Sequence, residues 1–233
     1  MTGRVLGVDA CRGGWVGVAL GGGATAAYVA RTVAGLVAAA EADGDLAVVA
    51  IDIPIGLPDT GRRAADVEAR RLIGPRRHSV FLTPVRAALT MPDHASASGT
   101  NRALAGDGVS AQAFALKKRI LEVDTWARSS GTDAVPRVVE VHPEVSFARL
   151  AGRPLATAKQ TWAGAEQRRA LLARAGIRLD GDLGAAEAAA GAVNMLDAAV
   201  AAWSAGRVAV GDATPIPDPP ERFSDTLPAA IWV

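Results

Sequence analysis

The stretch that decides the fold is RVLGVDACRGGWVGVAL, which spans Arg4–Leu20. It holds two short apolar runs, RVLGVD over Arg4–Asp9 and WVGVAL over Trp15–Leu20, with the pair Gly13-Gly14 between them. Apolar runs of this length joined across a glycine pair are typical of two antiparallel strands in a hairpin. The stretch therefore predicts a chain that opens with a β-hairpin, and it places Asp9 at the end of the first strand.

The segments after the hairpin extend it into a sheet. Gly21–Gly23 predicts a second turn, and Ala24–Ala30 predicts a third strand. Val33–Ala42 is rich in alanine and predicts a helix. Leu46–Ile53 reads LAVVAIDI, and its β-branched residues make it the best candidate for a buried strand. Three strands, a helix and a fourth strand form a β-β-β-α-β opening, which is typical of an α/β protein.

The middle of the chain, residues 54–136, has no strong strand pattern and predicts a helical insertion after the fourth strand. Helices are expected at Arg62–Ile73 and Ser110–Ala127. In the second of these, apolar residues recur at spacings of three and four, which indicates one apolar stripe. The segment Asp93–Gly108 is rich in Ser, Gly and Asn and predicts irregular structure.

The rest of the chain predicts three further short strands and three helices, and residues 1–233 are expected to form a single domain. Strands are expected at Arg137–Val141, Val208–Val210 and Ala229–Val233. One helix is expected to begin at Pro143, and two more to span Trp162–Ala175 and Ala185–Ala205. Pro215–Pro220 predicts a proline-rich connection.

Composition predicts a globular protein with an uneven distribution of charge. Half of the 233 residues are hydrophobic and 21% are charged, which excludes a disordered chain. The net charge of +1 gives no sign of a polybasic nucleic-acid binder. However, residues 1–61 carry three basic and six acidic side chains, 62–128 carry twelve and six, and 129–233 carry ten and twelve. The neutral total therefore hides a basic insertion between two acidic segments.

Several classes of protein are excluded by what the sequence lacks. Its one cysteine, Cys11, excludes an intrachain disulfide framework and a multi-cysteine metal site. Its three histidines are widely spaced, which argues against a zinc site. Met1–Leu20 carries charges among many glycines, which is unlike a signal peptide, and no nearby stretch is apolar enough to span a bilayer. We therefore expect a cytoplasmic protein with no membrane partner.

Four acids occupy places where a buried site would need them. They are Asp9 at the end of the first strand, Asp52 near the end of the fourth, Glu140 near the end of the fifth, and Asp197 in the last long helix. If the three strands are adjacent, these acids converge, and converged carboxylates repel one another unless a cation holds them. Because oxygen ligands favour hard ions, the pattern predicts a Mg²⁺ or Mn²⁺ site. Two such ions can activate water and stabilise the leaving oxygen of a phosphodiester.

A simpler interpretation treats each acid separately. Asp9 is then the cap of a turn, and Asp197 is an exposed residue on an ordinary amphipathic helix. The spacing alone does not decide between separate acids and one cluster.

Six motifs, taken in order, resemble a known group of proteins. They are GVDACRGGW (Gly7–Trp15), AIDIPIGLP (Ala50–Pro58), RRAADVEARRLIGPRRHSVF (Arg62–Phe81), SAQAFALKKRILEVD (Ser110–Asp124), EVHPEVSFARLAGRP (Glu140–Pro154) and NMLDAAVAAW (Asn194–Trp203). In this combination the chain resembles a bacterial family of unknown function whose members are regarded as predicted nucleases with the ribonuclease H-like fold. The resemblance implies a mixed five-stranded sheet flanked by helices.

The resemblance also implies an acidic site on the plan of ribonuclease H and the Holliday-junction resolvases. That plan has an Asp on the first strand, an acid on the fourth strand, and an acid on or before the last helix. Asp9, Asp52 and Asp197 match these places, and we add Glu140 because of its strand-end position and the EVHPE motif. Catalytic and metal-binding roles are therefore expected for these four residues.

Basic residues in and after the insertion predict a surface that faces phosphates. Arg63, Arg70, Arg77 and Lys159 are the candidates for contact with a nucleic-acid backbone. The alternative for the arginines is a set of surface ion pairs with acids at helical spacing. The chain departs from the family pattern at Gln160, beside Lys159, where a second lysine is usual.

Five more residues are predicted to support the acidic cluster. They are Gln112, Glu122, Asp124, His142 and Glu144. His142 projects to the same strand face as Glu140, so it could serve as a general base or a metal ligand. Glu144 could bind metal or place negative charge at a helix N-terminus. Purely structural roles, such as an ion pair between Asp124 and Arg128, remain open for each of them.

Three functions are consistent with these patterns. The first is a metal-dependent nuclease that hydrolyses phosphodiesters with two Mg²⁺ or Mn²⁺ ions and binds DNA or RNA on its basic insertion. The second is a non-catalytic nucleic-acid-binding or regulatory protein that keeps the fold. The third, a small actin-like phosphotransferase, is suggested only by the turn after the first strand. The sequence leaves the oligomeric state open, with a homodimer among the options.

Overall fold

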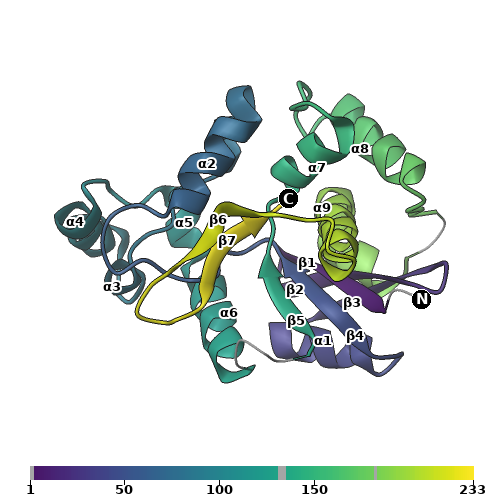
Figure 1. Cartoon of the computed structure of the whole chain (residues 1–233), viewed down its shortest axis with the longest axis horizontal. Helices are drawn as coiled ribbons and strands as arrows, with labels where there is room; N and C mark the ends of the chain where they lie inside the picture. Colours follow the sequence, from purple (N-terminus) through teal and green to yellow (C-terminus); the bar gives the residue numbers. More distant parts are fainter. Residues whose placement is uncertain (1–2, 131–134, 181–182) are drawn as a thin grey trace.

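A computed structural model describes residues 3–130, 135–180 and 183–233 of the chain. Its described part holds one mixed sheet in the order β3-β2-β1-β4-β5-β7-β6 (Figure 1). The seven strands of this part are β1 (Arg4–Cys11), β2 (Gly14–Gly21), β3 (Ala24–Ala30), β4 (Leu46–Ile51), β5 (Arg137–Glu140), β6 (Pro215–Arg222) and β7 (Pro228–Trp232). The α/β class is as expected, whereas a five-stranded sheet was two strands too few.

The helices lie between and after these strands. They are α1 (Val33–Glu41), α2 (Ala64–Ile73), the 3₁₀ helix η1 (Gly74–Ser79), α3 (Arg86–Leu89), α4 (His94–Ala105), α5 (Ala111–Ala115), α6 (Lys117–Ser130), α7 (Pro143–Ala151), α8 (Trp162–Arg174) and α9 (Ala185–Ala209).

The opening of the chain has the predicted β-β-β-α-β arrangement. Strand β2 pairs antiparallel with both β1 and β3, across the two glycine turns. Strand β1 pairs parallel with β4, and β4 pairs parallel with β5, so the three strands that end in acids are adjacent. The register joins Val8 to Ile51, and therefore the residues that follow them, Asp9 and Asp52, lie side by side at the carboxyl ends of their strands.

The C-terminal segment differs from the sequence prediction. Val208–Val210 is no strand, because α9 continues to Ala209. The proline-rich stretch 215–220 is not a connection but most of β6, which pairs antiparallel with β7 at the edge of the sheet. Proline lacks a backbone N–H, and an edge strand needs hydrogen bonds on one side only, so this position tolerates the prolines.

The described part of the insertion holds helices α2 to α6 and η1, joined by loops and without a strand, and residues 131–134 of the predicted range 54–136 lie outside the described part. The prediction of irregular structure at 93–108 was wrong. Asp93 caps α4 by accepting a hydrogen bond from the Ser96 amide at 2.8 Å, and Gly106 ends the helix in the left-handed conformation. The helix expected at 110–127 is broken at Leu116 into α5 and α6.

Helices cover both faces of the sheet (Figure 1). On one face, α1 and α6 pack on Leu6, Val8 and Trp15. On the other face, α9 lies directly against β1, because Gly7 has no side chain: a methyl group there would overlap the backbone of Ala198 and Ala202. This close approach explains the small residues along α9, and it brings Asp197 of that helix down onto the strand that carries Asp9.

Gly7→Ala tests this packing. We expect the substitution to lower the free energy of unfolding by more than about 2 kcal/mol, because the added methyl group meets backbone that cannot rotate away. Urea denaturation followed by circular dichroism measures the change. The matched control is Gly99→Ala on the exposed face of α4, where nothing lies within 4 Å and alanine favours the helix. Equal stability of the two variants would contradict direct packing of α9 on β1.

Candidate functional site

Three carboxylates meet where β1, β4 and α9 come together. Asp9 is in β1, Asp52 directly follows β4, and Asp197 is in α9. The Asp52 amide donates to the Val8 carbonyl at 3.0 Å, which continues the pairing of the two strands up to the acids. Asp9 is 7% exposed and Asp197 is 1% exposed, so both carboxylates are largely removed from water. The structure thus brings together the three acids that the resemblance matched.

The electrostatics of this acidic cluster (Asp9, Asp52 and Asp197) disfavour its fully charged state. Burial raises the pKa of Asp9 well above its ordinary value, and the charges of Asp52 and Asp197 raise it further. Burial also raises the pKa of Asp52, against the opposing effects of the neighbouring His142 and Lys159. Burial raises the pKa of Asp197 to about 6, although Lys159 opposes the shift. The acids therefore repel one another and retain protons more readily than exposed aspartates do.

Lys159 is the cation that the chain itself supplies to the cluster. Its Nζ donates to Asp197 Oδ2 at 2.5 Å, and the side chain comes from the segment between α7 and α8. Burial lowers the pKa of Lys159, but the neighbouring carboxylates, above all Asp197, outweigh burial and raise it. Asp197 Oδ1 is buried and has no hydrogen-bond partner among the described residues. One ammonium for three acids leaves the cluster with an excess of negative charge and an unused oxygen.

The donor set can be compared with the needs of a hard metal ion. Within residues 3–130, 135–180 and 183–233, no three His, Cys, Asp or Glu side chains are placed so that together they could hold one ion. Mg²⁺ sites commonly use only one or two carboxylates, with water and substrate phosphate as the remaining ligands. The oxygen-only cluster, with its unpartnered Asp197 Oδ1, suits that kind of site and does not suit a closed protein cage.

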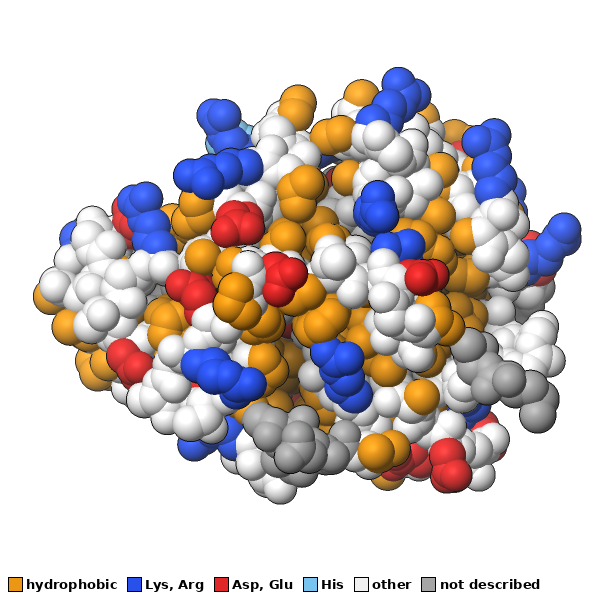
Figure 2. Space-filling model, viewed as in Figure 1, with side chains coloured by type: hydrophobic (Ala, Val, Ile, Leu, Met, Phe, Trp, Pro, Cys, Tyr) orange, Lys and Arg blue, Asp and Glu red, His pale blue; other side chains and the backbone are white. Residues whose placement is uncertain are grey.

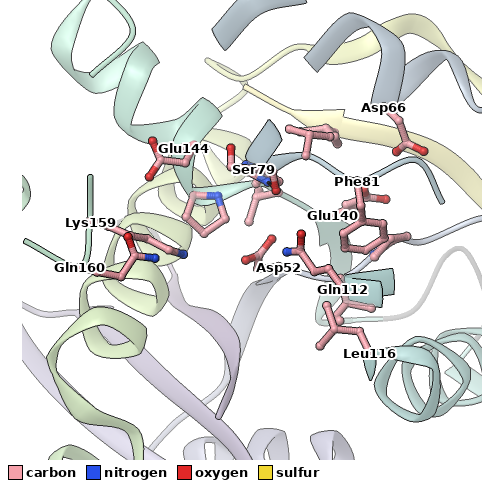
Figure 3. Close-up of a pocket in the computed structure, with 17 residues that line it drawn as sticks. Asp52, Asp66, Ser79, Phe81, Gln112, Leu116, Glu140, Glu144, Lys159 and Gln160 are labelled. Carbon is pink, nitrogen blue, oxygen red and sulfur yellow. Dashed lines mark hydrogen bonds between the residues drawn. The ribbon is translucent and has the colours of Figure 1, made fainter. Parts of the chain in front are cut away.

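A cleft of about 280 Å³ opens beside the cluster, and Asp52 forms part of its lining. Lys159 and Gln160 extend toward Asp52 from one side, below Glu144 (Figure 3). Gln112 extends from the opposite side, where Phe81 and Leu116 also lie (Figure 3). The cleft therefore has a cationic end at Lys159 and, across Asp52, an end with the apolar side chains of Phe81 and Leu116. We call the second the apolar end, although the acids Asp66 and Glu140 also lie there (Figure 3).

Glu140 lines the cleft but does not have the place that we expected for a metal ligand. Its Oε2 accepts from Arg63 Nη2 at 2.7 Å and from the Ile55 amide at 2.6 Å. Arg63 is fully buried, so it does not face solvent or a nucleic-acid backbone as the sequence suggested. The physical reason is the burial of Glu140, because a carboxylate that leaves water needs a cation and hydrogen-bond donors. This buried pair joins the start of α2 to the end of β5.

His142 and Glu144 lie on the cleft, but each has a structural contact. His142 Nε2 is 3.2 Å from the Ser79 carbonyl, whereas Nδ1 is buried without a partner in the described structure. Glu144 Oε1 accepts from Arg168 Nη2 at 2.6 Å in a buried ion pair at the start of α7. Glu144 therefore influences the cluster through its charge, which raises the pKa of Asp52 and Asp197, rather than as an open ligand.

Of the three candidates from the Ser110–Asp124 motif, only Gln112 lines the cleft. Glu122 Oε1 accepts from Trp15 Nε1 at 2.9 Å and from the Val33 amide at 2.8 Å, which ties α6 to β2 and α1. Asp124 forms ion pairs with Arg86 at 2.7 Å and with Arg128 at 2.9 Å. Glu122 and Asp124 therefore stabilise the fold at a distance from the cluster, and the pair of Asp124 with Arg128 has the spacing considered from sequence.

The remaining basic candidates lie beyond the cleft. Arg70 Nε donates to the Val80 carbonyl at 2.9 Å, so Arg70 supports the turn after η1, while Arg77 is exposed on η1. Basic side chains stand over the free ends of α2 and α7, on either side of a hollow (Figure 2). Those ends carry Arg71 and Arg149, respectively.

Sequence reasoning missed two parts of the site. Phe81 and Ser79 line the cleft, and the only signal for them was their position in the RRHSVF segment of a family motif. Arg168, the fully buried partner of Glu144, was also missed. Its signal was present: Arg168 lies at helical spacing between Ala165 and Leu172, two residues of the apolar stripe that α8 packs into the core.

The cluster predicts an unusual dependence of stability on pH. The pKa of Asp197 is about 6 in the folded chain and 3.8 ordinarily, so between these values the folded state binds more protons than the unfolded state. The contribution of Asp197 to stability therefore falls as the pH rises from about 4 to 6. We expect Asp197→Asn to remove about 2 kcal/mol of that fall, measured by denaturation at a series of pH values.

An exposed aspartate provides the control for the pH experiment. Hydrogen bonds from Ser96 lower the pKa of Asp93, so its contribution to stability is lost as the pH falls. Asp93→Asn should therefore change the slope in the opposite direction to Asp197→Asn. If Asp197→Asn leaves the slope of the wild type unchanged, its carboxyl group does not have a raised pKa.

The fold and the site define a class of protein: a mixed α/β sheet that carries carboxylates, buried or partly buried, at the ends of two parallel strands and on the helix packed across them. No helix in the described ranges is long and apolar enough to cross a membrane. Within this class, the chain belongs to the DUF429 family, described as a protein of unknown function, whose profile matches residues 7–222. Comparison with curated proteins and with solved structures gave no match.

Proposed function

We propose that this chain is a nuclease that depends on Mg²⁺ or Mn²⁺ and has a ribonuclease H-like fold. The observation that carries the proposal is the acidic cluster: Asp9 and Asp197 are buried, Asp52 is partly buried, and Asp197 Oδ1 has no hydrogen-bond partner among the described residues. Its acids come from the first strand, the end of the fourth strand and the last long helix, as the resemblance implied. The neighbouring strands β3, β2, β1, β4 and β5 support a ribonuclease H-like fold, although β7 and β6 make the described sheet larger than the five strands that the resemblance implied.

The residues of the chain have distinct roles in this proposal. Asp9 and Asp52 would hold one ion, and Asp9 with Asp197 would hold a second. Bound there, such ions supply a water nucleophile at neutral pH and stabilise the oxygen that leaves the phosphodiester. Lys159 is 29% exposed and lines the cleft, so its ammonium group would contact a phosphate oxygen that is bound beside the cluster. Exposed arginines such as Arg77 would hold the flanking backbone.

One observation favours a second candidate, a nucleic-acid-binding protein without turnover. Lys159 already gives Asp197 a positive partner at 2.5 Å, which reduces the need of the cluster for an ion. The actin-like phosphotransferase finds no comparable support, because the described residues form a single sheet rather than two lobes.

A metal titration distinguishes the first two candidates. Thermal melting of the wild type in EDTA, Mg²⁺ and Mn²⁺ should show a rise of about 5–10 °C at metal concentrations near 100 times the dissociation constant. The same samples are incubated with labelled single-stranded DNA, duplex DNA, branched DNA and RNA. A rise in melting temperature together with Mn²⁺-dependent cleavage supports the nuclease. Nucleic-acid binding with neither effect supports the second candidate and rejects the first.

A further inference from the structure

The apolar end of the cleft has features that cleavage of a phosphodiester does not require. The ring of Phe81 and the side chain of Leu116 line it, opposite the cationic end with Lys159. In Figure 3 the amide of Gln112 points from this end toward Asp52. A phosphate oxygen would favour the cationic end, so the apolar end is suited to a different part of a ligand.

The polar group at this end is free to bind. Gln112 is exposed at the start of α5, and its side-chain amide has no hydrogen-bond partner in the described part of the chain. An amide offers a donor and an acceptor side by side, which is the pattern that pairs with the edge of a nucleobase, adenine in particular. Phe81 is only partly buried, so it can offer its ring to a flat heterocycle.

The size of the cleft limits what it can hold. At about 280 Å³ it is close to the lower limit of small-molecule pockets, about 300 Å³, so it has room for one nucleotide and not for a stacked duplex. A base that enters it must therefore be unpaired or turned out of its stack.

We propose that the apolar end of the cleft binds a single unpaired nucleobase, which stacks on Phe81 and hydrogen-bonds to the amide of Gln112. The phosphate attached to that nucleotide then lies toward Lys159 and the acidic cluster. This inference rests on the proposed function for the class of ligand, and it deepens it: the substrate is a strand with an unpaired base at the reacting position, and an intact duplex is excluded.

The experiment compares adenosine 5′-monophosphate with ribose 5-phosphate, which carries the same phosphate and sugar but no base. Binding to the full chain is measured by calorimetry or NMR titration in EDTA, so that no turnover takes place. We expect the nucleotide to bind at least about 10-fold more tightly than ribose 5-phosphate, since one stacked and hydrogen-bonded base contributes at least that factor. The monophosphates of guanosine, cytidine and uridine complete the series.

Variants assign the preference to this end of the cleft. Gln112→Ala and Phe81→Leu should each remove most of the 10-fold preference, whereas Phe81→Tyr, which keeps a ring, should retain it. Lys118→Ala is the control, because Lys118 is exposed on α6 and does not line the cleft. Melting curves show whether each variant folds. If Phe81→Leu does not fold, Gln112→Ala still tests the site.

Each outcome has a definite meaning. Equal affinity for the nucleotide and ribose 5-phosphate overturns the inference, and so does a preference that survives in both Gln112→Ala and Phe81→Leu. Base preference without metal-dependent cleavage supports this inference and rejects the nuclease. Cleavage without base preference supports the nuclease and rejects this inference.

Discussion

Asp9→Asn is expected to abolish metal-dependent cleavage, with a loss of rate of more than about 100-fold. Replacing a residue that only orients a metal ligand typically costs 10- to 100-fold, and Asp9 would be a ligand itself. It is also the central acid, because the charges of both Asp52 and Asp197 act on it. The measurement is the initial rate of cleavage of the most reactive labelled nucleic acid in saturating Mn²⁺.

The same substitution should have an opposite effect on stability in the absence of metal. Asn has nearly the same shape as Asp but carries no charge, so it removes the two effects that raise the pKa of Asp9, the burial of its charge and the repulsion by Asp52 and Asp197. Asp9→Asn should therefore melt at a higher temperature than the wild type in EDTA and should lose the rise that Mn²⁺ causes. A fold that merely collapsed would instead melt at a lower temperature in every buffer, which separates loss of the site from loss of structure.

Asp212→Asn is the matched control, since Asp212 is exposed after α9 and its side chain forms no hydrogen bond or ion pair in the described structure. It should leave both the cleavage rate and the response to Mn²⁺ unchanged. Full cleavage by Asp9→Asn, or an equal loss in both variants, would contradict a catalytic role for the acidic cluster.

The parts of the fold and site that could be predicted are those encoded by local pattern. The glycine pair after Asp9 and the β-branched run before Asp52 predict two strands, and strand ends in a parallel pair lie at the same edge. Because Gly7 lets α9 approach β1, Asp197 joins them. The three acids could therefore be selected from sequence, although their convergence needed the pairing of β1 with β4 that only the structure supplies.

The parts that could not be predicted depend on contacts between distant segments. Glu140 and Arg63 are 77 residues apart, and nothing in the local pattern of either residue indicates that they pair. Considered separately, Glu140 was predicted to be a metal ligand, and Arg63 was predicted to be a surface cation that contacts phosphates. Similarly, β6 is proline-rich and is a strand only because β7 lies beside it. Tertiary pairing overrode local propensity in both cases.

Arg63→Met is expected to lower the free energy of unfolding by about 3–5 kcal/mol, the largest effect on stability that the structure predicts. Arg63 and Glu140 have side chains that are 0% and 5% exposed, so removal of the cation leaves a carboxylate in the core without its partner. Arg63 Nη1 also contacts Thr83 Oγ1 at 3.3 Å, and that contact is lost as well. Chemical denaturation at pH 8 measures the loss, because Glu140 of the wild type, whose pKa burial raises to about 7, is then mostly ionised, whereas without Arg63 it must stay unpaired or take up a proton.

Two further variants show whether the pair itself is responsible. Arg62→Ala removes the neighbouring arginine, whose ion pair with Asp107 is 54% and 33% exposed, and it should cost far less stability than Arg63→Met because water screens an exposed pair. Arg63→Met combined with Glu140→Gln removes both charges and should recover a large part of the stability, because no unpaired charge then remains in the core. If Arg63→Met is as mild as Arg62→Ala, then Arg63 is not the buried partner of Glu140. Arg63 would then again be a candidate for the role that the sequence suggested, a surface cation that contacts a nucleic-acid backbone.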